Sequence, residues 1–320
     1  MINIQVERFA LASAFRISRG AKTEADVVTV EVMRGGFTGR GECVPYARYR
    51  ETVESVRAQI RTLPADISRA DLQKALPAGA ARNAVDCALW DLEAKMQGKP
   101  VWQLAGLPQP VPQITAYTLS LDTPDAMEEA ARKNAHRPLL KIKLGTPDDL
   151  PRLQAVRRGA PGPAIIVDAN EGWSVFDYIA LAPHLVDLGV KLVEQPLPAV
   201  NDDALRGIAR PLPVCADESS HSRRELTDLV GKYDVVNIKL DKTGGLTEAI
   251  ALRRAAEAAG LKIMVGCMVG SSLSMAPAVL LAQGAAYVDL DGPLLLAEDR
   301  PQGLLYDAAG VHPPQADLWG

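Results

Sequence analysis

The chain has 320 residues, of which 48 % are hydrophobic and 23 % charged, and its formal net charge is −4. That length exceeds the roughly 250 residues of a single β/α barrel, so it leaves room for a barrel and a smaller domain. The net negative charge argues against the positive surface potential with which proteins bind nucleic acid or anionic membranes. We therefore expect a small-molecule partner.

Neither a membrane anchor nor a secretion signal is apparent. No apolar run reaches the roughly 18 residues that span a bilayer, and the N-terminus, MINIQVERFALASAF, lacks the basic-then-apolar order of a signal peptide. The 4 cysteines and 4 histidines are scattered, which argues against a zinc site. We expect a cytoplasmic protein that binds neither membrane nor nucleic acid. Whether it forms a homo-oligomer stays open.

The first hundred residues predict a small α+β unit. Two apolar-rich runs, 27–33 and 37–44, are separated by Arg-Gly-Gly and predict a β-hairpin whose glycines supply the positive φ of the turn. Helices are expected over 52–61 and 80–97. The Gly-Lys-Pro that follows ends the second helix.

After Pro112 the pattern changes to short apolar runs separated by helix-like stretches, which is typical of a parallel α/β sheet. Eight such strands with helical linkers can close as a barrel. An open doubly wound sheet is the alternative, but its glycine-rich nucleotide turn is missing, since the glycines of GGFTGRG lie in the predicted hairpin. The runs begin at Gln113, Leu139, Ala164, Lys191, Pro213, Val235, Lys262 and Tyr287.

Charged residues fall at the ends of consecutive predicted strands. Lys143, Asp168, Glu194, Asp217 and Lys239 follow one another at intervals of 22 to 26 residues, about one β/α unit each. In barrel enzymes the C-terminal ends of the strands form the active site. We therefore expect these side chains to converge on one cavity.

Asp168, Glu194 and Asp217 would then be three carboxylates facing one another, which requires a cation or a proton among them. All-oxygen ligands favour Mg²⁺, with Mn²⁺ as a substitute. The alternative is that each acid forms an ordinary ion pair with a nearby lysine or arginine. The regular spacing favours the metal site.

Lysines are expected on two sides of this metal site. Lys141 and Lys143 point to one face of their strand, and Lys239 lies on the strand across the barrel. Mutual repulsion and the metal should lower the pKa of the lysine pair, so that one lysine can act as a base near neutral pH. A solvated lysine pair on an edge strand is the alternative. Lys242 has the parity of the opposite strand face and is predicted to point away.

Five motifs stand at these strand ends, and with the helix sequence ARNAVDCALWDLEAKMQGKP they resemble the muconate-lactonising branch of the enolase superfamily over nearly the whole chain. They are K-x-K at 141–143, D-A-N at 168–170, E-Q-P at 194–196, A-D-E-S at 216–219 and N-I-K-L-x-K-x-G-G at 237–245. The resemblance implies an α/β fold with an N-terminal α+β capping domain over residues 1–110. Residues 111–320 would form a modified TIM-type (β/α)7β barrel whose C-terminal tail packs back towards the cap.

Asp289 and Asp291 are expected on one face of the eighth strand, because side chains alternate between the two faces of a strand. Together they would form a pair of carboxylates that binds a cation. A turn at the strand end is the alternative. The D-x-D pattern looks like that of the L-Ala-D/L-Glu epimerases, and this similarity implies that the pair of carboxylates binds the free ammonium group of a small acidic dipeptide. By the same resemblance Asn170, Met268 and Ser271 are substrate-binding residues of the pocket wall.

The resemblance also implies a mobile loop over about residues 15–25 that closes over the substrate. Lys22 would there meet the glutamate side chain, at a position where close relatives carry an arginine. Lysine keeps the charge but loses the bidentate geometry of arginine. Arg16 and Arg19 are alternative donors for the same carboxylate.

The chemistry that the family implies is epimerisation by 1,1-proton transfer. The substrate α-carboxylate would bind Mg²⁺, which stabilises an enediolate, while Lys143 and Lys239 exchange the α-proton on opposite faces and Lys141 adds positive charge. This predicts an isomerase, a dipeptide epimerase of murein peptide recycling. Alternatives on the same scaffold are o-succinylbenzoate synthase, muconate cycloisomerase and N-acylamino-acid racemase, whose substrates lack a free ammonium group. A non-catalytic binding barrel is disfavoured by the intact lysines and carboxylates.

Overall fold

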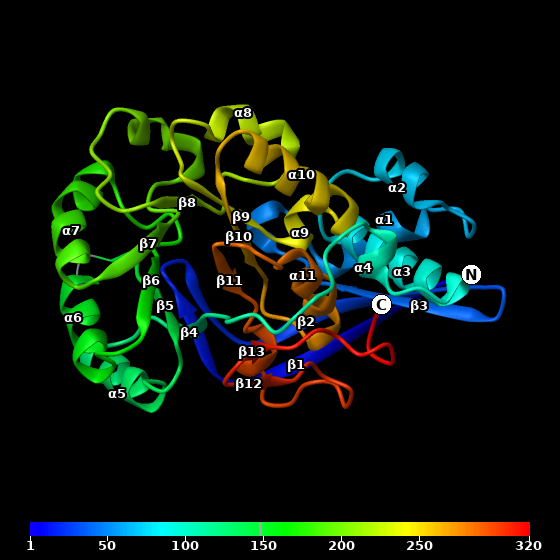
Figure 1. The fold of residues 1–320 in the computed structure, drawn as a ribbon, viewed down its shortest axis with the longest axis horizontal. Helices are drawn as coiled ribbons and strands as arrows, with labels where there is room; N and C mark the ends of the chain where they lie inside the picture. The colour runs from blue at the N-terminus through cyan, green and yellow to red at the C-terminus, as the bar shows by residue number, and fades with distance from the viewer. Residues whose placement is uncertain (147–148) are drawn as a thin grey trace.

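The N-terminal part of the chain forms a three-stranded antiparallel sheet (Figure 1). In this computed structural model, which describes residues 1–146 and 149–320, its strands are β1 (Ile2–Ile17), β2 (Gly20–Arg34) and β3 (Phe37–Cys43). β2 and β3 confirm the predicted hairpin, with Gly35 and Gly36 at φ of 56° and 81° in the turn. β1 was not predicted, and it pairs with most of β2, with one irregularity between Ala10 and Phe15.

Three helices pack on this sheet and bury its valines. They are α1 (Val53–Arg61), α2 (Arg69–Ala75) and α3 (Ala80–Gln97). α1 and α3 confirm the two predicted helices. α3 ends at Gly98, whose φ of 62° is the left-handed conformation that glycine adopts at helix C-termini.

β3 and α3 approach each other at backbone distance. A Cβ atom at Gly39 would lie 2.1 Å from the Ala88 carbonyl oxygen, and one at Gly41 would lie 2.2 Å from the Ala84 carbonyl oxygen. Any side chain would overlap the helix backbone there. Only glycine therefore fits at these two positions of β3.

Eight parallel strands form the second sheet, each paired with its neighbour along the chain. The Ala116 amide donates to the Val288 carbonyl oxygen at 2.8 Å, which joins the first strand to the last. The two sheets together confirm the predicted fold class. The first strand is shorter than predicted, because Gln113 pairs instead with Val311 of the C-terminal tail. The strands are β4 (Tyr117–Leu119), β5 (Leu139–Lys143), β6 (Ala164–Asp168), β7 (Val190–Glu194), β8 (Val214–Ala216), β9 (Val235–Ile238), β10 (Lys262–Gly266) and β11 (Tyr287–Asp289).

Helices connect these strands, and α5, α6 and α7 lie on the outside of the sheet (Figure 1). The connection after β7 differs from the predicted helical linker, since it holds two 3₁₀ turns, Ala199–Asn201 and Asp203–Arg206. Pro198 before these turns and Gly207 after them leave no uninterrupted stretch for a helix. The helices are α4 (Val101–Leu104), α5 (Pro124–Lys133), α6 (Asp149–Gly159), α7 (Val175–Asp187), α8 (Leu226–Leu229), α9 (Leu240–Thr243), α10 (Leu246–Ala258) and α11 (Ser272–Leu281).

The C-terminal tail returns to the N-terminal unit after a short hairpin of β12 (Tyr306–Asp307) and β13 (Gly310–Val311). The Trp319 indole donates to the Cys87 carbonyl oxygen of α3 at 3.0 Å. The tail thus packs on α3.

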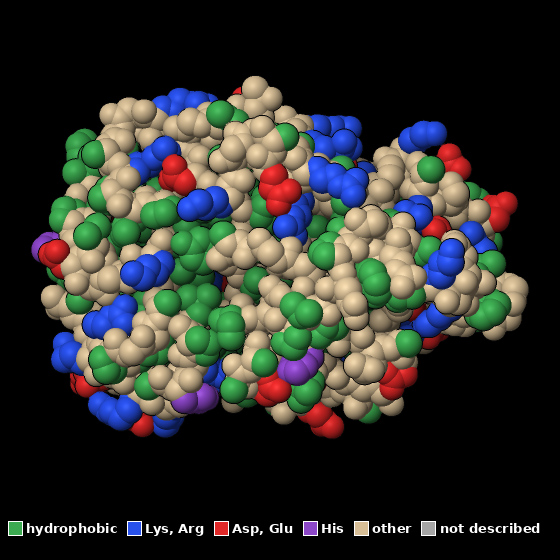
Figure 2. Space-filling model, in the orientation of Figure 1, with side chains coloured by type: hydrophobic (Ala, Val, Ile, Leu, Met, Phe, Trp, Pro, Cys, Tyr) green, Lys and Arg blue, Asp and Glu red, His purple; other side chains and the backbone are tan. Residues whose placement is uncertain are grey.

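Basic and acidic side chains alternate over the face drawn in Figure 2, without a broad area of one sign. This distribution agrees with the small formal net charge of −4. Among the described residues, no helix combines the length and the apolar character needed to cross a membrane.

Candidate active site

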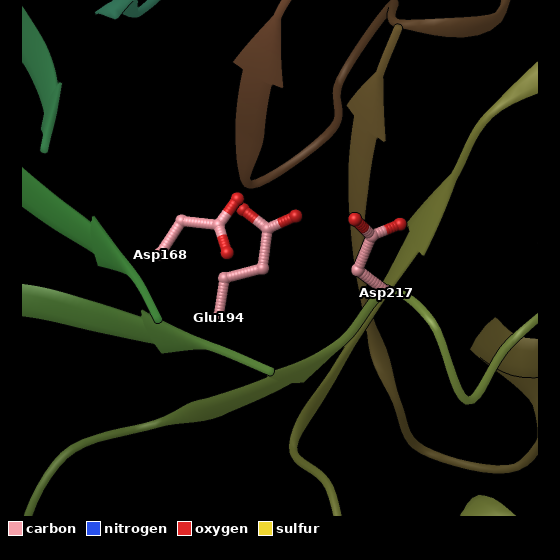
Figure 3. A group of neighbouring side chains, drawn as sticks. All are labelled: Asp168, Glu194 and Asp217. Carbon is pink, nitrogen blue, oxygen red and sulfur yellow. The ribbon is translucent and has the colours of Figure 1, made fainter. Parts of the chain in front are cut away.

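Three acids from adjacent strand ends face one space (Figure 3). The parallel register pairs Asp168 at the end of β6 with Glu194 at the end of β7, and Asp217 follows the end of β8. One oxygen from each carboxylate lies within 4.8 Å of the other two, and each residue is at most 2 % exposed. The structure therefore brings the three acids together.

The donor set suits a hard divalent cation, because it consists of buried oxygen atoms alone. Burial, and then the charge of Asp168, raise the pKa of Glu194 to about 7, whereas neighbouring lysines outweigh burial and lower the pKa values of Asp168 and Asp217. The Asn237 amide orients Glu194 by donating to its Oε1 at 2.7 Å. These residues fit Mg²⁺.

Lys141 provides positive charge among these acids. Its Nζ lies 2.6 Å from Glu194 Oε2, 2.7 Å from Asp289 Oδ2 and 3.1 Å from Asp168 Oδ2. Burial disfavours its charged form, but the three carboxylates outweigh burial and hold its pKa well above the usual value. The prediction was a lowered pKa. With the protein groups alone, the predicted lowering of the Lys141 pKa is wrong. The nearest charged groups are acids, which favour the charged lysine, rather than a second ammonium group, which would disfavour it.

Lys143, at the end of β5, and Lys239, directly after β9, line one cavity of about 880 Å³, and their strands are four apart in the sheet order. Lys143 Nζ donates to Asp168 Oδ2 and Lys239 Nζ to Asp217 Oδ2, each at 2.7 Å, and both residues are 7 % exposed. For Lys239, burial is again outweighed by carboxylates, chiefly Asp217, which raise its pKa. A small molecule above the acids would lie between these two lysines.

Lys242 contradicts the parity prediction. It belongs to α9, a helical turn that follows β9 directly, so the alternation of a strand does not apply to it. Its fully buried Nζ donates to Asp217 Oδ1 at 2.6 Å, to the Asp217 carbonyl oxygen at 2.5 Å and to the Asn237 carbonyl oxygen at 3.1 Å. Lys242 thus holds Asp217 in place from behind the cavity.

Gln195 is a further residue of the site that the sequence did not indicate, although it is the centre of the E-Q-P motif. Its φ of 35° lies in the left-handed region, which residues with a side chain rarely adopt. Its Oε1 accepts the amides of Asp217 at 2.9 Å and of Ser219 at 3.1 Å. Gln195 therefore fixes the turn that presents Asp217.

Asp289 and Asp291 both line the cavity, but only Asp289 belongs to the strand β11. Asp289 Oδ1 is buried and has no hydrogen-bond partner among the described residues. Asp291 Oδ2 accepts the Thr118 amide at 2.6 Å, and burial together with the charge of Asp289 raises the pKa of Asp291 to about 7. This pair of acids is thus suited to a cationic group of a ligand.

Residues 15–25 form the tip of the β1–β2 hairpin, where the prediction placed a loop; the tip reaches the barrel beside β5 (Figure 1). Lys22 lines the cavity there, and its Nζ lies 5.0 Å from the centre of the Tyr46 ring. Among the described residues no carboxylate lies within 4.0 Å of its ammonium group.

The two alternative donors on the hairpin are paired with acids of the barrel. Arg16 lies 2.7 Å from Asp122, and Arg19 lies 2.7 Å from Glu218. Of these three cations of residues 15–25, Lys22 is therefore the one without such a pair within the described part of the chain.

The remaining predicted wall residues have different positions. Asn170 and Met268 line the cavity. Ser271 is buried outside it: its hydroxyl donates to Glu42, and its oxygen accepts the Leu273 amide at 3.3 Å at the start of α11. The prediction of Ser271 as a wall residue is thus corrected, because the serine is the N-cap of a helix.

Family models match both parts of the chain. Residues 2–106 match the model described as mandelate racemase / muconate lactonizing enzyme, N-terminal domain. Residues 125–310 match the model described as enolase C-terminal domain-like.

Two curated relatives resemble nearly the full chain. An L-Ala-D/L-Glu epimerase of Escherichia coli is 45 % identical over 97 % of this chain and 99 % of its own length. An N-acetyl-D-glutamate racemase of Pseudoalteromonas is 47 % identical over 92 % of this chain and 95 % of its own length.

Two solved structures share the fold. An enolase family member of Agrobacterium tumefaciens with homology to dipeptide epimerases, holding sodium and L-Ala-L-Glu with an ordered loop, is 54 % identical, with a TM-score of 0.97 and coverage of 100 % of this chain and 99 % of that chain. A dipeptide epimerase of Methylococcus capsulatus, complexed with Mg and L-Arg-D-Lys, is 30 % identical, with a TM-score of 0.89 and coverage of 98 % and 97 %.

Proposed function

Because this chain belongs to the mandelate racemase / muconate lactonizing enzyme family of the enolase superfamily, we propose that it is a Mg²⁺-dependent dipeptide epimerase of the L-Ala-D/L-Glu type. The observation that carries the proposal is a cavity lined by a lysine on each side, beside three convergent acids, with a second pair of acids at the end of β11. An enzyme of this type would serve murein peptide recycling.

Asp168, Glu194 and Asp217 would hold the ion, whose chemistry when bound is to stabilise negative charge on the substrate α-carboxylate. The α-carbon would then lie between Lys143 and Lys239. One lysine, in its neutral form, takes the α-proton onto Nζ, and the other delivers a proton from Nζ to the opposite face. The configuration at the α-carbon inverts.

The two ends of the cavity would recognise the two ends of the dipeptide. Asp289 has an unpaired buried oxygen, and with Asp291 it would bind the ammonium group. Lys22, exposed and free of a carboxylate partner within the described chain, would meet the side-chain carboxylate of glutamate from the hairpin.

The second candidate is racemisation of N-acetylglutamate, which the Pseudoalteromonas relative favours. Its substrate carries the same carboxylates but no ammonium group. Lys141 pairs with Asp289 Oδ2 in either case, but a neutral acetamide would leave Asp289 Oδ1 and the Asp291 carboxylate without a cation of the ligand, which is costly for buried acids. The acid pair therefore favours the dipeptide.

α-Proton exchange in D₂O tests the proposal. The Mg²⁺-loaded protein is incubated with L-Ala-L-Glu, L-Ala-L-Met and N-acetylglutamate, and loss of each α-proton signal is followed by NMR. We expect kcat/KM for N-acetylglutamate to be at least roughly tenfold below that for L-Ala-L-Glu, since a hydrogen bond to the charged ammonium group contributes about 1.5 to 3 kcal/mol. Equal or faster exchange of N-acetylglutamate would favour the racemase instead. Absence of exchange with all three compounds would refute the chemistry.

The same assay tests the acidic specificity. Lys22→Ala should slow exchange of L-Ala-L-Glu more than that of L-Ala-L-Met, because only glutamate loses a charge partner. Lys22→Arg is the matched variant, and it should keep or sharpen the preference through its bidentate geometry. Equal losses for both dipeptides would remove Lys22 from substrate recognition while leaving the epimerase proposal intact.

A further inference from the structure

The tip of the β1–β2 hairpin is attached to the barrel by a charged side chain. At the turn, Arg19 Nη2 donates to Glu218 Oε1 at 2.7 Å, and Nη1 donates to the Asn170 carbonyl oxygen at 2.6 Å. The Glu218 side chain is 1 % exposed and follows Asp217 directly in the chain. The hairpin thus supplies the cation that a buried acid of the cavity needs.

Glu171 is a second anchor in the same place. Arg48, from the 3₁₀ turn Ala47–Tyr49 of the N-terminal unit, donates to both of its carboxylate oxygens at 2.8 Å, and Arg19 Nη1 lies 3.3 Å from one of them. The Glu171 side chain is 8 % exposed. Two arginines of the N-terminal unit therefore face two acids of the barrel, and the four charges balance in this closed arrangement.

The backbone of the barrel is shaped for this contact. Asn170 and Glu171 have φ of 45° and 66°, two consecutive left-handed residues that carry side chains. This turn directs the Asn170 carbonyl oxygen towards the hairpin, where it accepts from Arg19 and, at 3.3 Å, from the Ser18 hydroxyl. The same turn begins at Asp168, one of the three convergent acids.

The hairpin has an irregularity behind its tip. Ala10 pairs with Glu24, whereas Phe15 pairs with Lys22, so residues 11–14 of β1 face a single residue of β2. Before this offset, β1 is bonded to the barrel, since the Ala297 amide donates to the Ala10 carbonyl oxygen at 2.8 Å. The tip has its own backbone bond to the barrel, the Leu121 amide donating to the Arg16 carbonyl oxygen at 3.1 Å. The offset lies between these two attachments and is the place where the hairpin can bend.

We propose that Arg19 is a positioning residue: it latches the hairpin tip over the cavity by pairing with Glu218 and Glu171, and so holds Lys22 in place. The inference rests on the proposed function in one respect, that Lys22 binds the carboxylate of the substrate side chain. The latch itself is a property of the protein without substrate, and it can be measured there.

Hydrogen–deuterium exchange of the substrate-free protein tests the latch. Arg19→Gln should make backbone amides of residues 15–22 exchange at least about tenfold faster, because an ion pair with a buried acid is lost. Glu171→Gln, made from the barrel side, should give a smaller acceleration, since the pair with Glu218 remains. Arg8→Gln is the matched control: its guanidinium pairs with Asp26 on the same hairpin, but its side chain is 61 % exposed.

Unchanged tip exchange in Arg19→Gln would overturn the latch, as would an equal acceleration in Arg8→Gln, which would indicate general loosening of the hairpin. Melting temperature and Mg²⁺ affinity, measured by calorimetry, show whether each variant keeps the fold and the acids. Mg²⁺ affinity should match that of the parent protein, whereas the melting temperature of Arg19→Gln should fall because buried Glu218 loses its cation. A lost Mg²⁺ affinity would mean that Arg19 supports the acids rather than the hairpin.

Kinetics with L-Ala-L-Glu separate positioning from chemistry. Arg19→Gln should raise KM about tenfold and change kcat by less than about threefold, and Arg19→Lys should recover part of the loss. A lower kcat at unchanged KM would place Arg19 in proton transfer and refute the positioning role. If no dipeptide is turned over by the parent protein, the proposed function fails, while the exchange measurement still decides whether Arg19 is a latch.

Discussion

The acidity of Asp291 predicts a pH dependence of substrate binding. Burial and the charge of Asp289 raise the pKa of Asp291 to about 7. Only the ionised carboxylate attracts the dipeptide ammonium group, so kcat/KM should increase as the pH rises through about 7. At about pH 6 roughly a tenth of the group is ionised, which places kcat/KM about tenfold below the plateau of this rising limb.

The assay is kcat/KM for L-Ala-L-Glu from about pH 5.5 to about pH 8.5. Above about pH 8 the value should fall again, because the α-amino group of the dipeptide loses its proton there. Asp291→Asn keeps an oxygen for the Thr118 amide but cannot titrate, so its profile should lack the rising limb. A limb near pH 7 that persists in Asp291→Asn would refute this assignment. The titration would then belong to another acid, such as Glu194, whose pKa is also raised to about 7.

Three further predictions concern the acids, the lysines and the interface between the two parts of the chain. Replacing any of the three convergent carboxylates by its amide should abolish turnover, as should EDTA, and added Mg²⁺ should restore only the parent protein; full activity after exhaustive chelation would exclude a metal role. Lys143→Ala and Lys239→Ala should each lose epimerisation, yet each should still exchange the α-proton of one epimer in D₂O, and the two variants should prefer opposite epimers. Lys242→Met should instead weaken Mg²⁺ binding and slow the exchange of both epimers equally. Asp241 of α9 contacts the N-terminal part, since its Oδ1 accepts the Val44 amide at 3.0 Å and the Asn83 side-chain amide at 2.9 Å. Burial raises the pKa of Asp241 from 3.8 to about 7, so the folded state binds a proton that the unfolded chain releases. Between about pH 4 and 7 the free energy of unfolding should therefore decrease by up to about 4 kcal/mol, relative to Asp241→Asn in urea titrations, and a flat difference curve would contradict this.

Much of the barrel could be predicted because its signals are local. A buried parallel strand is a short apolar run, and a side chain at its carboxyl end lies near the ends of neighbouring strands whatever the rest of the chain does. Asp168, Glu194 and Asp217 converge for that reason alone. The alternation of Ile2, Ile4 and Val6 with polar residues is an equally local signal for β1, which lies outside the predicted hairpin.

What could not be predicted depends on where an element ends and on partners distant in sequence. Lys242 was assigned to the wrong face because β9 ends at Ile238 and a helical turn follows, and no residue pattern marks that change. Ser271 is a helix N-cap bonded to Glu42, which lies 229 residues away in the chain. The pairing of Arg19 with Glu218 spans 199 residues and requires the hairpin to cross from one unit to the other.

The close approach of β3 to α3 has a consequence for how the hairpin can move. Because Gly39 and Gly41 leave no side chain between strand and helix, neither element can slide or tilt against the other without backbone overlap. The sheet from which the hairpin extends is therefore a rigid base, and bending of the hairpin is confined to the residues beyond the offset between Ala10 and Phe15. Substitutions at either glycine should thus be tolerated far less than substitutions at the exposed tip. Selection for a different substrate can therefore change the tip of the hairpin, but not its base.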